Sequence, residues 1–191
     1  MNHHLECNMS LPDNETYISV DVETAGPNPG QYAMLSIGAC TVTEPFETFY
    51  VEIQPDKKAF SPEALGVSGL SMENLREQGL PPEQAMQQFT DWVVNITPPD
   101  HRPIFVAFNA AFDWMFVNDY FHRYLGHNPF GHSALDMKAF YMGMTGVAWA
   151  ETGFEKVTEY FGIQHPLTHN ALQDALDQAK LFKKMLEKTQ S

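Results

Sequence analysis

The sequence has few cysteines and no long apolar segment. Its two cysteines, Cys7 and Cys40, are too few for the disulfide framework of a small secreted domain, so we expect a reducing, cytoplasmic setting. No apolar run approaches the roughly 20 residues of a membrane-spanning helix, and we expect no membrane association. Residues 1–14 have neither the basic start nor the apolar stretch of a signal peptide, and we expect them to form a flexible tail.

Positive charge is also scarce. The 191 residues include 11 Lys and Arg against 24 Asp and Glu, a net charge of −13. A protein that grips many phosphates of a long duplex usually carries a basic face. Lysines gather only at positions 57–58 and along 180–188, and the second group is typical of the solvated end of a terminal helix. Any bound nucleic acid is therefore expected to be short, or held mainly at one end.

The patterning of residues 15–190 predicts a single α/β domain. Apolar and polar residues alternate over 17–24, 34–42 and 47–54, which predicts three strands of an antiparallel meander. A buried strand is expected at 104–108. Helices are expected at 61–69, 71–79, 81–96, 110–122, 135–145, 153–162 and 171–188. This order predicts an α/β sandwich with a mixed sheet flanked by helices.

Asp21 and Glu23 lie two residues apart in the first predicted strand. Their side chains should share one face, about 6.6 Å apart along the chain, while Ile18, Val20 and Val22 occupy the other. Adjacent carboxylates repel each other unless a positive charge lies between them, and a divalent cation commonly fills that place. The alternative is a solvated strand end, since an Asp-x-Glu pair is common by chance in so acidic a chain.

Three further candidates lie on later elements. Asp113 falls in the first turn of a helix after a buried strand, where the helix terminus favours the ionised carboxylate; the alternative is an aspartate that only complements the dipole. His169 and Asp174 are five residues apart, about 140° around a helix. We therefore place His169 in the loop before a cap at Asn170, and Asp174 inside the helix. A loop imidazole suits a general base near neutral pH, although an exposed histidine without a role is the alternative.

Taken together, the Asp-x-Glu pair, the later Asp and the His-x-x-x-x-Asp segment resemble the site of the DEDDh exonuclease family. The similarity runs from Tyr17 to about Lys184 and includes the segments DVETAG, SPEALGVSGL, VAFNAAFDWMF and HNALQDALDQA. The subfamily with tyrosine four residues before the last Asp is not matched, because Asn170 holds that position. Within the family, the chain is most similar to the ribonuclease T and proofreading-subunit branches.

This resemblance implies an RNase H-like fold, with a mixed five-stranded sheet flanked by helices. It also implies metal-dependent release of nucleoside 5′-monophosphates from the 3′ end of short single-stranded RNA or DNA. It implies two Mg²⁺ or Mn²⁺ ions, about 3.5–4 Å apart in such sites. Asp21 would bridge both ions, with Glu23 and Asp174 completing the one on the nucleophile side. Asp113 would hold the second ion, and His169 would take the proton of the attacking water.

Substrate contacts also follow from the resemblance. The expected positions are Thr24, Ala25, Gly26, Leu65, Val67 and Phe130. Ribonuclease T stacks bases on phenylalanines at two places where this chain has Pro27 and Val67, whereas Phe130 matches a third. A stacked base contributes roughly 1–3 kcal/mol, so base preference should differ from that of ribonuclease T.

Two other functions fit the sequence less well. One is a catalytically silent RNase H-like module that binds a polymerase or another protein, but such a module would tolerate the loss of a site residue and all five are present. The other is a hydrolase of small nucleotides or dinucleotides, which the acidic composition favours. A homodimer or a polymerase-type partner is consistent with the family resemblance.

Overall fold

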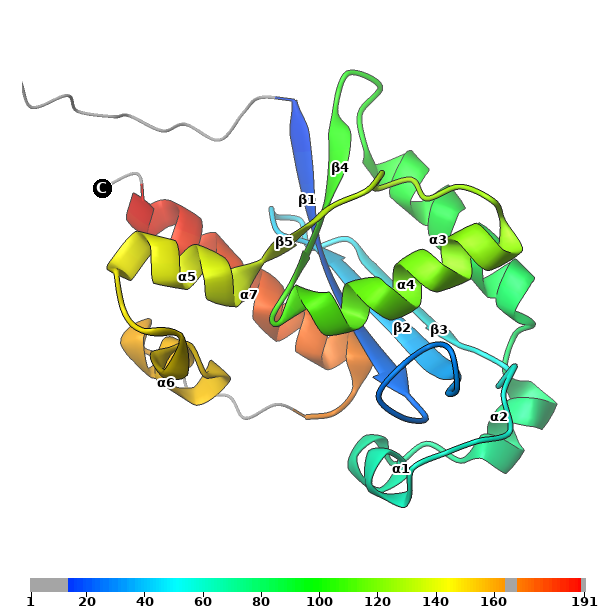
Figure 1. The fold of residues 1–191 in the computed structure, drawn as a ribbon. Helices are drawn as coiled ribbons and strands as arrows, with labels where there is room; N and C mark the ends of the chain where they lie inside the picture. Colours follow the sequence, from blue (N-terminus) through cyan, green and yellow to red (C-terminus); the bar gives the residue numbers. More distant parts are fainter. Residues whose placement is uncertain (1–13, 164–167, 190–191) are drawn as a thin grey trace, which may run out of the picture.

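The computed structural model describes residues 14–163 and 168–189. A five-stranded mixed sheet in the order β3-β2-β1-β4-β5 lies at its centre, with helices on both faces (Figure 1). The expected fold class is thereby confirmed. Most of the expected tail, residues 1–13, lies outside the described part of the chain, and the carbonyl of Asn14 accepts a hydrogen bond from the backbone N–H of Arg102.

The elements follow the expected order. The strands are β1 (Glu15–Thr24), β2 (Met34–Thr41), β3 (Thr48–Glu52), β4 (Arg102–Ala107) and β5 (Ala134–Asp136). The helices are α1 (Pro62–Ser68), α2 (Met72–Gln78), α3 (Pro82–Ile96), α4 (Ala110–Tyr124), α5 (Met137–Thr145), α6 (Phe154–Tyr160) and α7 (Ala171–Thr189), with a 3₁₀ turn at Trp149–Glu151. None of the helices in the described ranges combines the length and hydropathy needed to span a bilayer.

Strand β1 separates the two faces of the sheet. Ile18, Val20 and Val22 belong to the hydrophobic cluster under α3 and α4, as their alternation predicted. Asp21 and Glu23 therefore project to the other face, on which α7 packs. The parallel pairing with β4 stops at Ser19, so the end of β1 runs on beyond its neighbour. This places both acidic residues at the carboxyl ends of parallel strands, where open α/β sheets commonly bind ligands.

Helix α7 approaches β1 closely because β2 carries a glycine at the contact. Gly38 pairs with Asp21 in the antiparallel ladder. A Cβ atom built on Gly38 would lie only 2.1 Å from the carbonyl carbon of Ala171. The first turn of α7 thus rests on the backbone of β2, and this contact brings Asp174 to the strand that carries Asp21.

Side-chain caps fix where two of the helices begin. Asn170 accepts a hydrogen bond of 3.0 Å from the backbone N–H of Gln173, which supports its predicted role as the cap of α7. Asp136 accepts one of 2.9 Å from Ala139 and caps α5, which begins at residue 137, within the segment 135–145 expected to be helical. The two residues before the helix belong to β5, a strand too short to leave an alternating pattern.

Candidate active site

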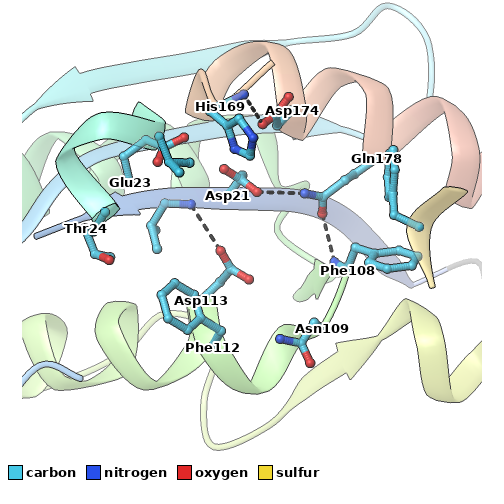
Figure 2. Close-up of a pocket in the computed structure, with 14 residues that line it drawn as sticks. Asp21, Glu23, Thr24, Phe108, Asn109, Phe112, Asp113, His169, Asp174 and Gln178 are labelled. Carbon is cyan, nitrogen blue, oxygen red and sulfur yellow. Dashed lines mark hydrogen bonds between the residues drawn. The ribbon is translucent and has the colours of Figure 1, made fainter. Parts of the chain in front are cut away.

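All five residues proposed from the sequence line one cleft (Figure 2). Asp21 and Glu23 come from the end of β1 and Asp113 from the first turn of α4. His169 lies in the loop before α7, and Asp174 lies in the first turn of that helix. The cleft therefore forms where three segments distant in sequence meet at one end of the sheet.

The end of β1 that extends beyond its pairing with β4 holds Asp113 in place. Its Oδ1 accepts a hydrogen bond of 3.1 Å from the backbone N–H of Val22, which lies beyond the last residue paired with β4. The side chain is only 5% exposed. The backbone N–H of Val22, which has no partner on β4, thus holds the Asp113 carboxylate beside the end of β1.

Asp174 shapes the loop that carries His169. Its Oδ1 accepts hydrogen bonds from the backbone N–H and the hydroxyl of Thr168, at 2.8 and 2.9 Å, and its Oδ2 accepts one of 2.9 Å from the N–H of His169. His169 has a φ of 56°, a left-handed conformation that costs a non-glycine residue energy and is held here by these bonds. One potential ligand atom from each of Glu23, His169 and Asp174 lies within 4.8 Å of the others.

Asp21 has a hydrogen-bond donor that the sequence analysis missed. The Nε2 of Gln178 donates to its Oδ1 at 2.8 Å, while the Oε1 of Gln178 accepts from the backbone N–H of Phe108 at 2.8 Å. Gln178 lies four residues after Asp174, on the same face of α7. That spacing is the only signal in the sequence that places it near the site.

The electrostatics of the cleft are dominated by like charge. Burial raises the pKa of Asp21 well above its ordinary value, and three neighbouring carboxylates raise it further. Burial and the charge of Asp174 raise the pKa of Glu23 to about 7. Burial also raises the pKa of Asp113, against the hydrogen bond from Val22. Each shift shows that the surroundings disfavour the ionised carboxylate.

This donor set fits divalent cations. No lysine or arginine is among the described residues that line the cleft, so the protein itself supplies no cationic side chain to balance the carboxylates there. Oxygen donors from carboxylates suit hard ions such as Mg²⁺ or Mn²⁺. The four carboxylates are therefore the residues that could hold metal ions.

The expected substrate contacts divide into two groups. Thr24 and Val67 line the cleft, and Val67 is 48% exposed. Ala25 and Leu65 pack together in a separate hydrophobic cluster and are not among the described residues that line the cleft. The carbonyl of Gly26 accepts a hydrogen bond from the Thr24 hydroxyl, so Gly26 supports a residue of the cleft lining.

Phe130 does not lie with these residues. Its ring packs against Phe89, Phe105 and Phe121 in the core and is 7% exposed. It is absent from the described lining of the cleft. The expectation that Phe130 stacks on a base is therefore corrected, because tertiary packing turns the ring into the core.

Aromatic side chains that the sequence analysis did not assign to substrate line the cleft instead. They are Phe112, next to Asp113, and the pair Phe108 and Phe154, whose rings meet edge to face with centroids 5.0 Å apart. Asn109 also lines the cleft, in a left-handed conformation with a φ of 65°. The four-residue spacing of Phe112 and Phe116 is typical of an apolar helix face, but it does not say which element lies opposite that face.

The fold and the cleft define a nuclease of the DEDDh class. The sequence model of the RNase_T exonuclease family matches residues 18–182, and the chain belongs to that family. It is accordingly a 3′–5′ exonuclease that hydrolyses phosphodiester bonds, as the resemblance implied. Enzymes of this family use divalent metal ions.

Two relatives illustrate the range of similarity. The 3′-5′ DNA exonuclease Cap18 of Escherichia coli is 46% identical over 171 residues, covering 90% of this chain and 91% of the relative. A ribonuclease T of Baumannia cicadellinicola subsp. Homalodisca coagulata is 33% identical over 178 residues, covering 86% of this chain and 80% of the relative.

Solved structures share the fold at low identity. The nuclease domain of 3′hExo, a DEDDh family member bound to rAMP, has a TM-score of 0.80 and 15% identity, covering 94% of this chain and 95% of that one. Exonuclease I of E. coli in complex with a dT13 oligonucleotide has a TM-score of 0.68 and 22% identity. That match covers 93% of this chain but spans only 42% of the exonuclease I chain.

Proposed function

We propose that this protein removes nucleotides one at a time from the 3′ ends of short single-stranded DNA and releases nucleoside 5′-monophosphates. The observation that carries the proposal is the convergence of four carboxylates and an imidazole in one cleft lined by apolar walls. The sequence left RNA and DNA equally open. The name of the relative with 46% identity now favours DNA.

Asp21, Glu23, Asp113 and Asp174 are proposed to hold two divalent cations, Mg²⁺ or Mn²⁺. When bound, such ions stabilise the charge on the attacking and leaving oxygens of a phosphodiester. The protein contributes by preorganisation. The bonds from Val22 to Asp113 and from the 168–169 loop to Asp174 fix both carboxylates before any ligand arrives.

His169 is proposed to be the general base. Its ring lies at the cleft within reach of the carboxylates, and the side chain is exposed. A ring nitrogen can therefore take the proton of the attacking water and pass it on to solvent. The carboxylate of Asp174 holds the backbone of His169, so the position of the base and that of a proposed metal ligand are set by one side chain.

The walls of the cleft are proposed to receive the terminal nucleotide. Ala64 and Val67 of α1 and Phe112 of α4 offer apolar surface for a base, and Thr24 lies beside Glu23. Leu65, Ala25 and Gly26 support this wall. Aromatic and aliphatic contacts of this kind tolerate any base, so weak sequence preference is expected.

The test uses a 5′-labelled single-stranded DNA, its RNA counterpart and a dinucleotide, each incubated with Mg²⁺ or Mn²⁺. We expect a ladder that shortens from the 3′ end by single nucleotides on DNA, and no ladder with EDTA or with Asp21→Asn. Faster cleavage of RNA would overturn the choice of DNA. Cleavage of the dinucleotide alone would favour the small-nucleotide hydrolase, and no cleavage by the folded wild type would contradict the proposal.

A further inference from the structure

Gln178 joins three elements of the site through one amide group. It lies on α7, its side chain is 2% exposed, and it contacts Asp21 on β1 and Phe108 at the end of β4 (Figure 2). Both bonds measure 2.8 Å. A buried polar side chain with two short bonds to other segments is held in one orientation.

The direction of each bond follows from chemistry. The backbone N–H of Phe108 can only donate, so it requires the carbonyl oxygen of the Gln178 amide. The amide nitrogen then faces Asp21, whose Oδ1 accepts the hydrogen bond. Asparagine is one methylene too short to span the same two partners. An ionised glutamate could accept from Phe108 but has no proton to donate to Asp21.

We propose that Gln178 is a positioning residue that fixes the Asp21 carboxylate for metal binding and locks the β4–α4 loop to α7. The inference rests on the proposed function and extends it to a residue outside the five-residue pattern. Among the described residues, Gln178 alone donates a hydrogen bond to the Asp21 side chain, and without it Asp21 would turn away from the three carboxylates that it faces. The loop that leads to Asp113 would lose its tie to the helix that carries Asp174.

The first test measures metal binding and not activity. Mg²⁺ and Mn²⁺ are titrated calorimetrically into metal-free wild type and Gln178→Met, a variant that keeps the length of the side chain but not the amide. We expect the variant to bind metal about 10–100-fold more weakly, the usual cost of losing a partner that orients a ligand. Gln173→Met is the matched control. It makes the same change on the same helix, at an amide that donates to Asp177, and should bind as wild type does.

The second test separates kcat from KM. At saturating metal, Gln178→Met should lower kcat on 5′-labelled single-stranded DNA by about tenfold or more, with little change in KM, because the amide orients Asp21 and not the substrate. Gln178→Glu keeps the shape and the acceptor for Phe108 but loses the donor, and should lose kcat equally. If Gln178→Met does not fold, the kcat of Gln178→Glu decides whether the amide donor is needed.

The proposal would be overturned if folded Gln178→Met, or Gln178→Glu in its place, kept the kcat of wild type at saturating metal, or if Gln178→Met kept its metal affinity. A change confined to KM would also overturn it, since that result assigns Gln178 to substrate contact. If the wild type cleaves nothing, the proposed function fails, but the calorimetric comparison still decides whether Gln178 positions Asp21.

Discussion

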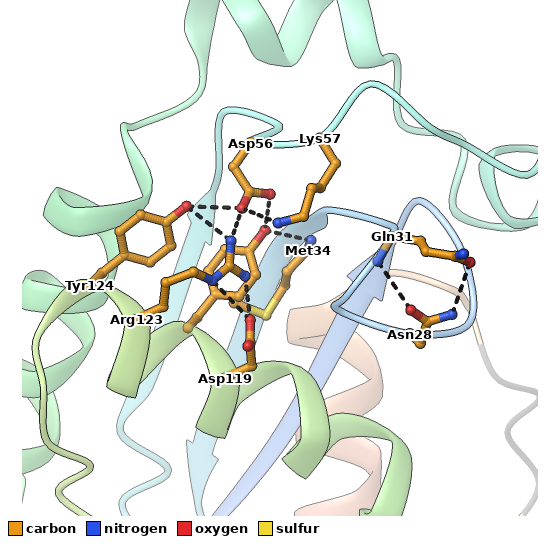
Figure 3. A network of polar contacts seen from close by, with 9 residues as sticks. Asn28, Gln31, Met34, Asp56, Lys57, Asp119, Arg123 and Tyr124 are labelled. Atoms are coloured by element: carbon orange, nitrogen blue, oxygen red, sulfur yellow. Dashed lines mark hydrogen bonds and ion pairs between the residues drawn. The ribbon is translucent and has the colours of Figure 1, made fainter.

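Two acidic clusters in this protein differ in how their charge is balanced. Asp56 accepts hydrogen bonds from the hydroxyls of Tyr120 and Tyr124, at 2.7 and 2.9 Å, and forms ion pairs with Arg123 and Lys57 (Figure 3). The cleft instead gathers four carboxylates, with no lysine or arginine among its described lining residues. In the first cluster, lysine and arginine side chains of the protein balance the negative charge. In the second, no lysine or arginine of the described lining does so.

The pKa values follow this difference. Burial raises the pKa of Asp56, but the bonds from the two tyrosines and Arg123 outweigh it, so the pKa lies below its ordinary value. Burial and neighbouring carboxylates raise the pKa of Asp21 and of Glu23. A carboxylate paired with a cationic side chain stabilises the folded chain, while carboxylates without a cationic partner are suited to bind cations from solution.

The largest expected effect is the loss of activity in Asp21→Asn. Metal ions contribute several kcal/mol of transition-state stabilisation, so removing the carboxylate proposed to hold both should lower kcat/KM by about 10³-fold or more. The measurement is the rate of shortening of labelled single-stranded DNA. Asp91→Asn, an exposed change on α3, is the control. Activity within tenfold of wild type would contradict the proposed role.

His169→Ala should come next. Loss of a general base typically costs 10²–10⁴-fold in rate, so we expect kcat to fall by about 10²-fold with little change in KM. Single-turnover cleavage at saturating enzyme isolates this step. His122→Ala, at an exposed position on α4, is the matched control. Equal rates for the two variants would remove His169 from the mechanism.

The metal-free protein should lose stability as pH rises. Glu23 has a pKa of about 7 in the folded protein against an ordinary 4.5, so between these values the folded state binds more protons than the unfolded chain. The free energy of unfolding therefore falls across that range, and the raised pKa of Asp21 acts in the same direction. Thermal melts at several pH values should show the decline, and added Mg²⁺ should reduce it. Stability that rises over this range would contradict the assignment.

Asp56→Asn tests the other half of the comparison. Replacing a carboxylate that accepts two hydroxyl bonds and an arginine bond should lower the free energy of unfolding by about 2 kcal/mol. The catalytic rate of the folded fraction and the metal affinity should not change. Urea denaturation measures the effect, with Asp119→Asn, a more exposed partner of Arg123, as a control expected to cost about 0.5 kcal/mol. A loss of metal binding in Asp56→Asn would break the distinction between the clusters.

The smallest effect is expected for Val67→Ala. Val67 is half exposed on the cleft wall, so truncation should remove about 1 kcal/mol of apolar contact with a terminal base and raise KM about fivefold. Initial rates on a dinucleotide and on a longer strand measure it. Val94→Ala, exposed on α3 and outside the cleft lining, is the control. An unchanged KM would remove Val67 from the substrate contacts.

Local patterns in the sequence placed each of the five cleft residues on its element, and the resemblance to the DEDDh family joined them into one site. Alternation in β1 set Asp21 and Glu23 on one face, and the cap at Asn170 placed His169 before α7. These are short-range properties of a strand and a helix end. The fifth strand was not located, because three residues carry no periodicity, whereas the helix after it was expected at 135–145 and lies at Met137–Thr145.

Tertiary contacts account for what the sequence could not predict. Gln178 is connected to the site by its hydrogen bonds with Asp21 and Phe108, which are 157 and 70 residues away in sequence. The close contact between Gly38 and the start of α7 is likewise invisible until the helix is placed. Phe130 was misassigned because a motif gives the residue type, while core packing decides where its ring points. The single-domain boundary at 15–190, a homodimer or polymerase-type partner, and a cytoplasmic location remain predictions.

The central claim is that the carboxylates of the cleft lack positive charge that metal ions supply. Calorimetric titration of Mg²⁺ and Mn²⁺ into metal-free wild type, Asp21→Asn and Asp56→Asn tests it most directly. We predict binding by wild type and by Asp56→Asn, and its loss in Asp21→Asn. No binding by folded wild type, or equal binding by all three proteins, would contradict the account.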